Sequence, residues 1–576
     1  MKKFLKRVTI ALICIANLVF PACNSGENNS AHECIFDQKI ESADFLYAEA
    51  TCKHATKYYY SCLCGKAGEE IFYKGKPLSH EYVEIVADKY KVKEATCYEG
   101  GVYYKSCVSC GLRSTTTFET GTTDNHQFNQ KVEKPKYIKV APTLETEGVY
   151  YKSCKCGLAG TETFVGEKLR MYMAEEKVDY QPTSLTVTLY DSENSVYGFT
   201  YNTTKESPYP VIQVRVKGEE RWNEYLAEVE QVEGSQRYTT KVEVALQPNT
   251  AYEYRAYDKY VDIGTEIVAF NTKNPKAKTF TFSHVSDTQG YPTYFNAVLQ
   301  QTSKTSDFLL HTGDVVEDST TENEWTEMLN GNFSYVSKIP IMAMSGNHET
   351  TYKAGTYETY KHFHYKMPKQ ESMIRGFYYS FVYGDVKFIM LNTNNIVNTA
   401  SWRGIEEAQY NWLIDELENN TCKWTIVSMH NPLYSVEKYG SDPSRNTVAL
   451  LLQSQLQGVF AQYGVDIVLQ GHDHCVSRTY PIDAQGKPKA ENWETENGIS
   501  YSVDPSGVIY VMDGTSGAQA RSPISGYNAS LYEYALKSNA STWAEYTFCE
   551  NKVTVTVKYS ETGKVQKTWG IKKTTL

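Results

Sequence analysis

The sequence contains no long run of basic residues and no excess of positive charge. Its 576 residues include 58 Lys and Arg against 68 Asp and Glu, which gives a formal net charge of −10. Nucleic-acid-binding domains normally carry a basic patch, so we expect no nucleic acid among the partners. The composition also lacks the low hydrophobicity of disordered chains, since 41% of residues are hydrophobic. At this length we expect two to four folded domains, each able to bury a core.

No apolar stretch after the N-terminus approaches the roughly 18 residues that a membrane-spanning helix needs. At the N-terminus, four basic residues precede an apolar run over 8–20 and then Pro21-Ala22-Cys23, a pattern typical of a secretory signal. We predict a signal peptide over 1–22 and a linker over 23–30. Ala22-Cys23 resembles the end of a bacterial lipobox, in which case Cys23 carries a lipid; the alternative is secretion with Cys23 unmodified. We expect an extracytoplasmic protein, secreted or held at the membrane as a lipoprotein, with the cell wall as a further partner.

Residues 31–170 contain three similar units with a period of about 46 residues. Each has two adjacent tyrosines followed by a cysteine pair and a glycine, as in Tyr59-Tyr60-Ser61-Cys62-x-Cys64-Gly65. A histidine opens each unit, and an Ala-Thr-Cys triplet precedes the tyrosines in the first two, whereas Thr143 replaces that cysteine in the third. The recurring residues are His32, Cys52, Cys62, Cys64, His80, Cys97, Cys107, Cys110, His126, Cys154 and Cys156.

Two interpretations of these units remain open. One His and three Cys within a unit could form a structural zinc site, because thiolate and imidazole are preferred zinc ligands. The alternative is a set of small β modules with disulfides or free thiols, which an exported chain tolerates. The odd cysteine number in the first two units favours metal, although Cys34 could complete a pair, and Thr143 argues against zinc in the third. Either way, the units are typical of surface or cell-wall spacers rather than catalysts.

Residues 171–275 show short stretches of alternating apolar and polar residues separated by polar turns. The clearest stretches are 185–189, 211–216 and 239–244, and this pattern predicts a small β-sandwich. Residues 246–255, with Phe270-x-Thr272 after them, resemble the strand-turn-strand of fibronectin type III domains. They are most similar to the version that precedes the catalytic domain of purple acid phosphatases. We expect a packing or substrate-framing role for this domain.

Residues 276–576 interleave apolar strands with helical patterns, which predicts a layered α/β domain. Strands are expected over 280–286, 308–311, 339–344, 386–391, 424–429, 465–469 and 508–512, and helices over 406–417 and 450–460. Polar residues follow five of these strands: Asp287-Thr288-Gln289, Gly313-Asp314, Gly346-Asn347-His348-Glu349, His430, and Gly471-His472-Asp473-His474. Ligands gather at the carboxyl ends of strands in open α/β sheets, so this ordered set predicts a metal centre rather than packing.

The series resembles the signature of the calcineurin-like metallophosphoesterase superfamily, in the purple acid phosphatase-like branch. The resemblance implies a four-layer (αββα) domain that holds two divalent metal ions, Mn, Fe or Zn. Matched by position, Asp287 and His474 would hold the first metal and Asn347, His430 and His472 the second, with Asp314 bridging them. His348 would stabilise or protonate the leaving oxygen, and Glu349 or a backbone carbonyl would orient its ring.

Two positions depart from that signature. Gln289 stands where many members have a metal-binding histidine, and both direct ligation and an outer position remain open for it. Glu317 stands where purple acid phosphatases have a tyrosine, so we expect a non-purple relative; Glu317 and Asp318 could also be solvated loop charges. Asn392 and Tyr434, at other strand ends, are candidates for lining the pocket.

The expected chemistry is hydrolysis of a phosphorylated small molecule. Two cations that share a carboxylate can orient a phosphoryl group and generate a hydroxide nucleophile near neutral pH. The sandwich domain favours a phosphomonoesterase of the acid phosphatase kind. The first alternative is a phosphodiesterase or nucleotide-diphosphate hydrolase, and the second is a catalytically weak protein that binds the envelope.

Overall fold

The computed structural model describes residues 34–574, apart from 94, 96, 98–99, 122–125, 232–234, 351–357, 371–375 and 438–446. The expected signal peptide and linker, with Cys23 and His32, lie outside the described residues. Among the helices of the described ranges, none is long and apolar enough to cross a membrane. The chain divides into two compact units, Met1–Glu81 and Tyr82–Leu576.

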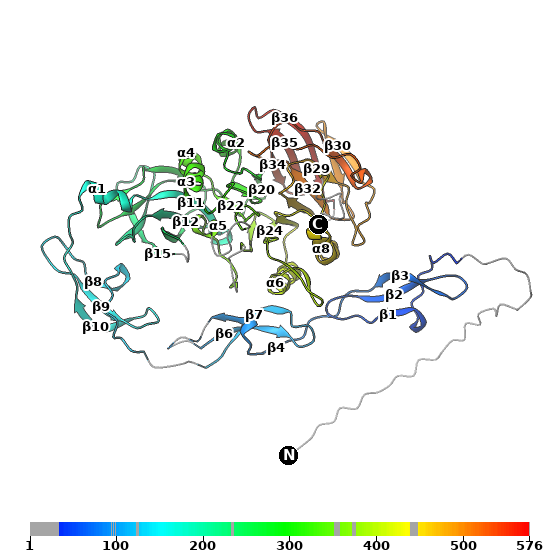
Figure 1. The fold of residues 1–576 in the computed structure, drawn as a ribbon, viewed down its shortest axis with the longest axis horizontal. Coiled ribbons are helices and arrows are strands. Elements are labelled where there is room, and N and C mark those ends of the chain that lie inside the picture. Colours follow the sequence, from blue (N-terminus) through cyan, green and yellow to red (C-terminus); the bar gives the residue numbers. More distant parts are fainter. Residues whose placement is uncertain are drawn as a thin grey trace, which may run out of the picture. The chain divides into compact units, whose positions relative to one another are not determined.

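The first unit is a small antiparallel sheet of three strands, shown in blue in Figure 1. The strands are β1 (Leu46–Ala48), β2 (Thr56–Ser61) and β3 (Ala67–Lys74). Its buried apolar side chains are few: Phe45, Ala55, Cys62 and Phe72. A sheet of this size therefore has little core of its own.

The second unit begins with two more small antiparallel sheets. One contains β4 (Tyr82–Val83), β5 (Lys91–Lys93), β6 (Val102–Cys107) and β7 (Arg113–Glu119); the other contains β8 (Ile138–Val140), β9 (Val149–Ser153) and β10 (Ala159–Val165). In all three small sheets, the glycine after the cysteine pair has a positive φ: 82° at Gly65, 72° at Gly111 and 84° at Gly157. Glycine adopts this backbone conformation without the steric cost of a Cβ, which explains why it recurs there.

A β-sandwich follows, built from two sheets. One contains β11 (Thr183–Asp191), β12 (Val196–Thr203), β15 (Glu228–Glu230) and β16 (Tyr238–Ala245); the other contains β13 (Pro210–Val216), β14 (Asn223–Leu226), β17 (Ala251–Asp258), β18 (Ile263–Gly264) and β19 (Val268–Asn271). Apolar side chains such as Val187, Phe199 and Tyr254 are buried and belong to one cluster with the core of the next domain. The Tyr254 hydroxyl donates a hydrogen bond to the Ser337 carbonyl at 2.5 Å, so the sandwich and the following domain share a continuous interior.

The rest of the second unit is an α/β domain with two large sheets. The eight-stranded sheet has the order β22 (Ile341–Ala343), β21 (Phe308–His311), β20 (Thr279–Val285), β34 (Thr542–Cys549), β35 (Lys552–Tyr559), β36 (Val565–Lys572), β31 (Ile499–Val503) and β30 (Asn492–Glu496). The seven-stranded sheet has the order β23 (Tyr379–Tyr383), β24 (Val386–Leu391), β27 (Trp424–Met429), β28 (Ile467–Gln470), β32 (Ile509–Asp513), β29 (Val476–Thr479) and β33 (Tyr532–Leu536).

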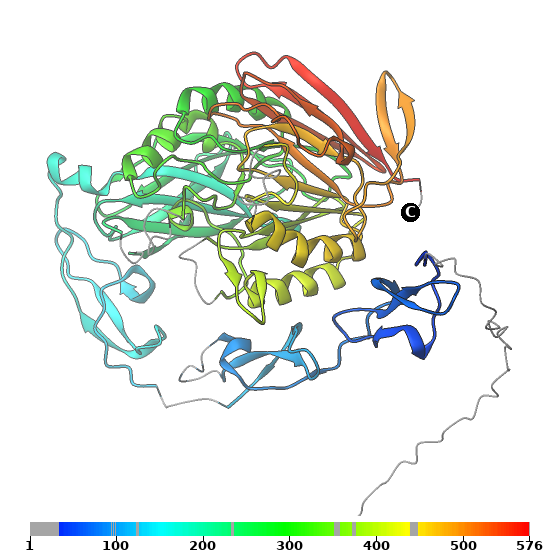
Figure 2. The ribbon, with the colours of Figure 1, turned by 45° about the vertical axis from the view of Figure 1, so that its right-hand side comes forward.

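Helices cover the outer faces of the two sheets, and Figure 2 shows this layered arrangement. The helix α2 (Pro292–Thr305) packs on β20, and α3 (Glu322–Asn330) and α4 (Phe333–Val336) pack beside it. On the other side lie α6 (Glu407–Glu418), α8 (Thr447–Leu452) and α9 (Gly458–Gln462), with a π-helical turn at Gln453–Gln457 between the last two. Aromatic side chains fill the space between the sheets; for example, the Phe282 and Phe388 rings are 5.3 Å apart and edge-on.

The parallel strands of each sheet end at the same level. In the eight-stranded sheet His311 pairs with Val285 on one side and with Ala343 on the other. In the seven-stranded sheet Met429 pairs with Gln470. The loops that follow these strands therefore leave the sheets together, which brings residues distant in sequence to one place.

Candidate metal centre

The backbone at these strand ends adopts an unusual conformation. Asp287, Gln289, Asp314 and His472 have φ angles of 53°, 43°, 56° and 72°. Positive φ costs a residue with a side chain energy, on the order of 1–3 kcal/mol, and such strain clusters at functional sites. Gly346 is restricted as well, because a Cβ at that position would lie 2.1 Å from the Asp314 Oδ1. The turns thus hold these side chains in one fixed arrangement.

One group of donor atoms surrounds the side-chain oxygen of Asn347. This Oδ1 is 2.9 Å from the His430 Nε2 and 2.7 Å from the His472 Nδ1. The Asp314 Oδ2 lies 3.3 Å from the His430 Nε2, and the donor atoms of Asp314, His430 and His472 all lie within 4.8 Å of one another. The His430 Nδ1 donates to the Thr312 carbonyl at 2.9 Å, which fixes the ring so that Nε2 points into the group.

A second group contains Asp287 and His474. The His474 Nε2 lies 3.5 Å from the Asp287 Oδ1, and its Nδ1 donates to the Gln519 carbonyl at 2.9 Å. The backbone N–H of His472 donates to both carboxylate oxygens of Asp287, at 3.1 Å each. The two groups are therefore joined through His472, and the structure brings together the six residues Asp287, Asp314, Asn347, His430, His472 and His474.

The loop after β32 positions the backbone of Asp287 through hydrogen bonds. The Thr515 hydroxyl and the Ala518 N–H both donate to the Asp287 carbonyl, at 2.7 and 3.0 Å. This support is not apparent from the sequence. The only signal for it is the polar loop that follows another apolar strand.

The electrostatics of the centre reflect buried carboxylates beside imidazoles. Burial raises the pKa of Asp287, but its hydrogen bond to His474 and the charges of His474 and His430 lower it overall below the usual range. Burial disfavours the charged form of His430, yet the charge of Asp314 and a hydrogen bond to it raise the His430 pKa to about 9. For His472, burial and the charge of His430 lower the pKa to about 4. The buried carboxylates and the imidazoles around them thus determine one another's pKa values.

His348 lies at the open side of the centre. Its Nδ1 donates to the Glu317 carbonyl at 2.7 Å, and its Nε2 is 3.0 Å from the Gln289 Nε2 and 3.8 Å from the Asp314 Oδ2. The Glu317 carbonyl is therefore the group that orients the ring, while the Glu317 carboxylate is 59% exposed. The Gln289 amide thus donates a hydrogen bond to the His348 Nε2, the ring nitrogen that is nearest to Asp314.

Glu349 has a different task from orienting the His348 ring. Its buried carboxylate accepts hydrogen bonds from the N–H groups of Asp314 at 2.8 Å, Gly346 at 2.7 Å and Val315 at 2.8 Å. Burial, together with the charge of Asp314, raises the pKa of Glu349 to about 7. Glu349 thus fastens the loops after β21 and β22 to each other, a role that its position in the sequence did not reveal.

Asn392 and Tyr434 are held by other neighbours. The Asn392 Oδ1 accepts from the Asn394 N–H at 3.0 Å. The Tyr434 ring is 4.6 Å from that of Tyr510, and its hydroxyl donates to the Gln457 side chain. These contacts fix both side chains without involving a ligand residue.

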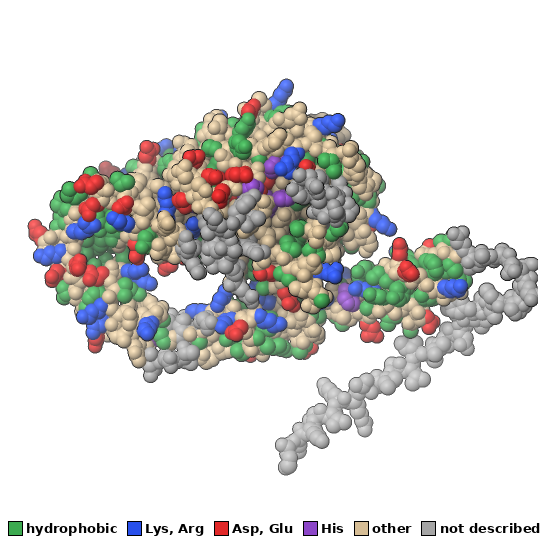
Figure 3. Space-filling view, in the orientation of Figure 1, with side chains coloured by type: hydrophobic (Ala, Val, Ile, Leu, Met, Phe, Trp, Pro, Cys, Tyr) green, Lys and Arg blue, Asp and Glu red, His purple; other side chains and the backbone are tan. Residues whose placement is uncertain are grey.

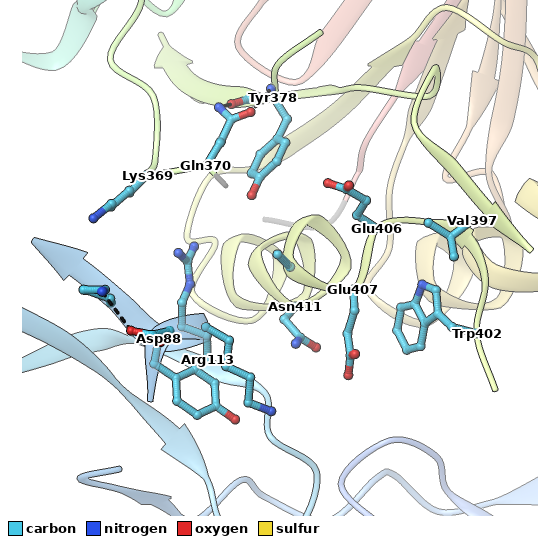
Figure 4. Close-up of a pocket in the computed structure, with 14 residues that line it drawn as sticks. Asp88, Arg113, Lys369, Gln370, Tyr378, Val397, Trp402, Glu406, Glu407 and Asn411 are labelled. Atoms are coloured by element: carbon cyan, nitrogen blue, oxygen red, sulfur yellow. Dashed lines mark hydrogen bonds and ion pairs between the residues drawn. The ribbon is translucent and has the colours of Figure 1, made fainter. Parts of the chain in front are cut away.

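The centre is accessible to solvent. Gln289, Asn347, His348 and His472 are all partly exposed, and Figure 3 shows histidine side chains grouped beside acidic ones on the surface. A separate pocket beside α6, lined among others by Gln370, Tyr378, Trp402 and Glu407, contains none of the strand-end ligands (Figure 4). The chemistry therefore belongs to the strand ends and not to that pocket.

The cysteines of the small sheets also gather. Cys34, Cys62 and Cys64 form one group in the first unit, and Cys97, His126, Cys154 and Cys156 form another in the second. Cys52 and His80 belong to the first unit, whereas Cys107 and Cys110 belong to the second. The expectation that each site takes all its ligands from its own repeat is wrong for the third repeat, because Cys97 of the second repeat joins it. Thr143 is not a missing ligand, since its hydroxyl bonds Thr146 at 2.7 Å within its own loop.

Comparison with known proteins agrees with this geometry. Residues 280–476 match the family model of the calcineurin-like phosphoesterases. This part of the chain is a calcineurin-like phosphoesterase domain. All the strand-end residues from Asp287 to His474 lie within the matched range.

The chain is also similar to known acid phosphatases over part of its length. The chain is 27% identical over 194 residues to purple acid phosphatase 15 of Arabidopsis thaliana, covering 33% of this chain and 31% of that protein. It is 27% identical over 198 residues to acid phosphatase type 7 of Homo sapiens, covering 32% of this chain and 42% of the relative. The matches thus span less than half of either relative. A purple acid phosphatase from yellow lupin (Lupinus luteus) seeds has the same fold, with a TM-score of 0.56 and 17% identity over 74% of this chain and 80% of that one.

Proposed function

We propose that this chain is a metal-dependent hydrolase of phosphate esters that prefers phosphomonoesters. The observation that carries the proposal is the arrangement of two adjoining donor groups, one of Asp314, Asn347, His430 and His472 and one of Asp287 and His474. The hydrogen bonds from the His472 N–H to Asp287 join them. The relatives named acid phosphatases support the choice of a monoester. A phosphodiesterase or nucleotide-diphosphate hydrolase is the competing function.

The donor set fits two divalent cations. Carboxylate, amide and imidazole groups suit Mn, Fe or Zn, and two buried carboxylates need positive charge nearby. Asp287, His474 and Asp314 would hold one cation, and Asp314, Asn347, His430 and His472 the other. Such a pair supplies Lewis acidity and makes a water acidic enough to act as a nucleophile near neutral pH. Because Glu317 replaces the tyrosine of the purple enzymes, we expect a colourless centre.

The residues of the chain have separate tasks in this reaction. Asp314 supplies negative charge between the two donor groups, and Glu349 holds its backbone in place. His348 turns its Nε2 towards the open side, where it can stabilise or protonate the leaving oxygen. Burial disfavours the charged form of His348, but the charge of Asp314 and the hydrogen bond to the Glu317 carbonyl raise its pKa overall. The Gln289 amide N–H can donate only to the neutral ring, so protonation of Nε2 requires the amide to turn its oxygen towards that nitrogen.

We also propose that the β-sandwich is the fibronectin III-like domain of the acid phosphatase branch and that it supports the catalytic domain. Its Asn202 side chain is 3.0 Å from the buried His362 Nδ1, and Trp325 stacks on the same ring at 4.3 Å. His362 ends α5 (Glu358–His362), in the connection that follows the loop of His348. The sandwich would thus brace one side of the active site without contributing a catalytic group.

The test is an assay of the purified full chain with Mn²⁺ against p-nitrophenyl phosphate, its bis ester and a nucleotide diphosphate. We expect the monoester to be hydrolysed fastest. Faster turnover of the bis ester or of the nucleotide would replace the monoesterase assignment with the competing function. Absence of turnover on all three substrates would contradict the proposal. An Asp314→Asn preparation assayed in parallel would reveal any contaminating phosphatase.

A further inference from the structure

Four side chains with soft donor atoms meet in the Cys-rich part of the second unit, far in sequence from the strand-end centre. The Cys97 Sγ lies 2.7 Å from the His126 Nδ1 and 3.4 Å from the Cys154 Sγ. The Cys156 Sγ lies 3.6 Å from the His126 Nδ1. All four donor atoms are within 4.8 Å of one another. The group contains three thiols and one imidazole, and no carboxylate.

These distances fit a tetrahedral metal ion better than a disulfide. A zinc ion with Zn–S distances of about 2.3 Å places its sulfur ligands about 3.8 Å apart, and the Cys97 and Cys154 sulfurs are 3.4 Å apart. A disulfide needs sulfur atoms about 2.05 Å apart, well below that separation. Three cysteines and one histidine are an established combination for structural zinc.

The local structure prepares the ligands for such an ion. Cys154 directly follows β9, and the Gly157 N–H donates to its carbonyl at 2.8 Å, while the Cys154 N–H donates to the Leu158 carbonyl at 2.8 Å. This tight turn, which requires the positive φ of Gly157, presents Cys154 and Cys156 on the same side. The thiols are thus held close together by the backbone before any ion binds.

The fourth ligand comes from the preceding module. Cys97 lies between β5 and β6 of the four-stranded sheet, 57 residues before Cys154. Its thiol joins His126 and the cysteine pair of the next sheet, β8–β10. An ion bound here would therefore connect two consecutive modules rather than stabilise one of them alone.

The arrangement recurs, which argues against chance proximity. In the first unit Cys34, Cys62 and Cys64 also lie within 4.8 Å of one another, with the Cys34 and Cys64 sulfurs 3.6 Å apart. The sequence repeats the order of one cysteine, one histidine and a cysteine pair in Cys52, His80, Cys107 and Cys110. The order of one cysteine, one histidine and a cysteine pair thus occurs twice in the sequence, and a further cysteine pair has a third thiol beside it, which indicates a built site.

The modules also need such a ligand for stability. The sheet β8–β10 buries few large apolar side chains, chiefly Tyr137 and Tyr150. Domains of this size rarely obtain enough free energy from their core and depend on a metal ion or disulfides. A metal ion that binds only the folded module would add its binding free energy to folding.

We propose that Cys97, His126, Cys154 and Cys156 bind a structural zinc ion that fastens the second Cys-rich module to the third. The site is separate from the catalytic centre in position and in donor chemistry. Its role is structural: it holds the sheet β4–β7 and the sheet β8–β10 together through shared ligands.

The experiment uses the full-length protein purified with its catalytic centre loaded with Mn²⁺, so that bound zinc reports on the cysteine sites. Zinc per chain is measured for the wild type, for Cys97→Ser and for Cys156→Ser. Cys549→Ser, which removes an exposed thiol at the end of β34, is the matched control. We expect Cys97→Ser and Cys156→Ser each to lose about one zinc per chain, and Cys549→Ser to keep the zinc content of the wild type. The rate of phosphate-ester hydrolysis should be the same in all four proteins.

Two further measurements on the wild type keep the proposal testable if a variant is degraded. X-ray absorption at the zinc edge should show mainly sulfur neighbours, and replacement by cobalt should produce thiolate-to-cobalt charge-transfer absorption. The strand-end centre has no thiol, so neither signal can arise from it. Zinc surrounded only by nitrogen and oxygen, an unchanged zinc content in both test variants, or a Cys97–Cys154 disulfide in non-reduced peptide maps would each overturn the proposal.

Discussion

The strand-end centre and the group around Cys97 are two places where metal-binding side chains gather, and they differ in what surrounds them. The strand-end centre lies on loops between an eight-stranded and a seven-stranded sheet, over a core with many completely buried aromatic and aliphatic side chains. The group around Cys97 lies on loops of a four-stranded and a three-stranded sheet with few buried side chains. The first uses oxygen and nitrogen donors, and the second uses mainly sulfur.

This difference indicates opposite relations between fold and ligand. Each fully buried large apolar side chain contributes about 1.5–3 kcal/mol, so the phosphoesterase domain can hold its ligands in place, strained turns included. The small modules gain much less from burial, while ordering each residue still costs about 1–2 kcal/mol of backbone entropy. In the large domain the fold positions the metal ligands, whereas in the modules the bound metal would hold the fold.

Removal of all metal should separate the two regions most clearly. We expect a strong chelator to abolish hydrolysis and to expose residues 97–156 to protease, while a fragment containing the sandwich and the phosphoesterase domain resists digestion. Limited proteolysis followed by mass spectrometry of the fragments would measure both effects. Equal digestion of the two regions would contradict this difference between them, because the large domain would then also depend on its metals for folding.

Substitution of the shared ligand should abolish catalysis without unfolding the domain. Asp314→Asn keeps the shape of the side chain but removes the negative charge between the two donor groups. Because metal and charge stabilisation contribute several kcal/mol to such reactions, we expect kcat to fall at least about 10³-fold. The measurement is steady-state hydrolysis of p-nitrophenyl phosphate together with thermal unfolding.

The matched control for this substitution is Glu561→Gln, which neutralises an exposed carboxylate in the turn between β35 and β36. We expect this control to retain full activity. Retention of near-normal turnover by Asp314→Asn would refute the role of Asp314. Loss of the folded state would instead mean that the phosphoesterase domain, like the small modules, depends on its bound metal for folding.

Removal of the His348 ring tests a group that contacts the centre without serving as a ligand. We expect His348→Ala to lower kcat by about 10²-fold or more, in the range typical of general acid–base catalysis. The metal content should stay at the wild-type value, because the donor atoms of Asp314, Asn347 and His430 are untouched. Metal analysis alongside the kinetics would decide this, and a loss of metal would assign His348 a structural part in the centre.

The sequence was sufficient to predict which strand-end residues come together in the fold, because these signals are local. Predicted strands such as 308–311 and 424–429 coincide with β21 and β27. His430 directly follows β27, and Asp314 is three residues after the end of β21. The strands β34–β36 were not predicted, because their residues are buried at some positions and partly exposed at others, whereas the strands predicted for this domain are continuous apolar runs. The hydrogen bonds that Glu349 accepts from the N–H groups of Asp314 and Gly346 were not predictable, because they form only when the loops after β21 and β22 lie side by side. The pairing of Cys97 with the next repeat was also missed, because a period gives the spacing of ligands but not which repeat supplies them.

Gln289 gives the test with the smallest expected effect, because its side chain contacts His348, which is not one of the predicted metal ligands. Its amide donates to the ring nitrogen of His348 that faces Asp314, and one such hydrogen bond contributes about 0.5–1.5 kcal/mol. We therefore expect Gln289→Ala to lower kcat by up to about tenfold, with the metal content and the thermal stability unchanged. Gln289→His, which supplies an imidazole at the same strand end, should tighten metal binding in a titration of the metal-free protein. If Gln289→Ala instead loses one metal ion per chain, the Gln289 amide is a metal ligand. The loop after β20 would then supply two ligands to the strand-end centre, Asp287 and Gln289.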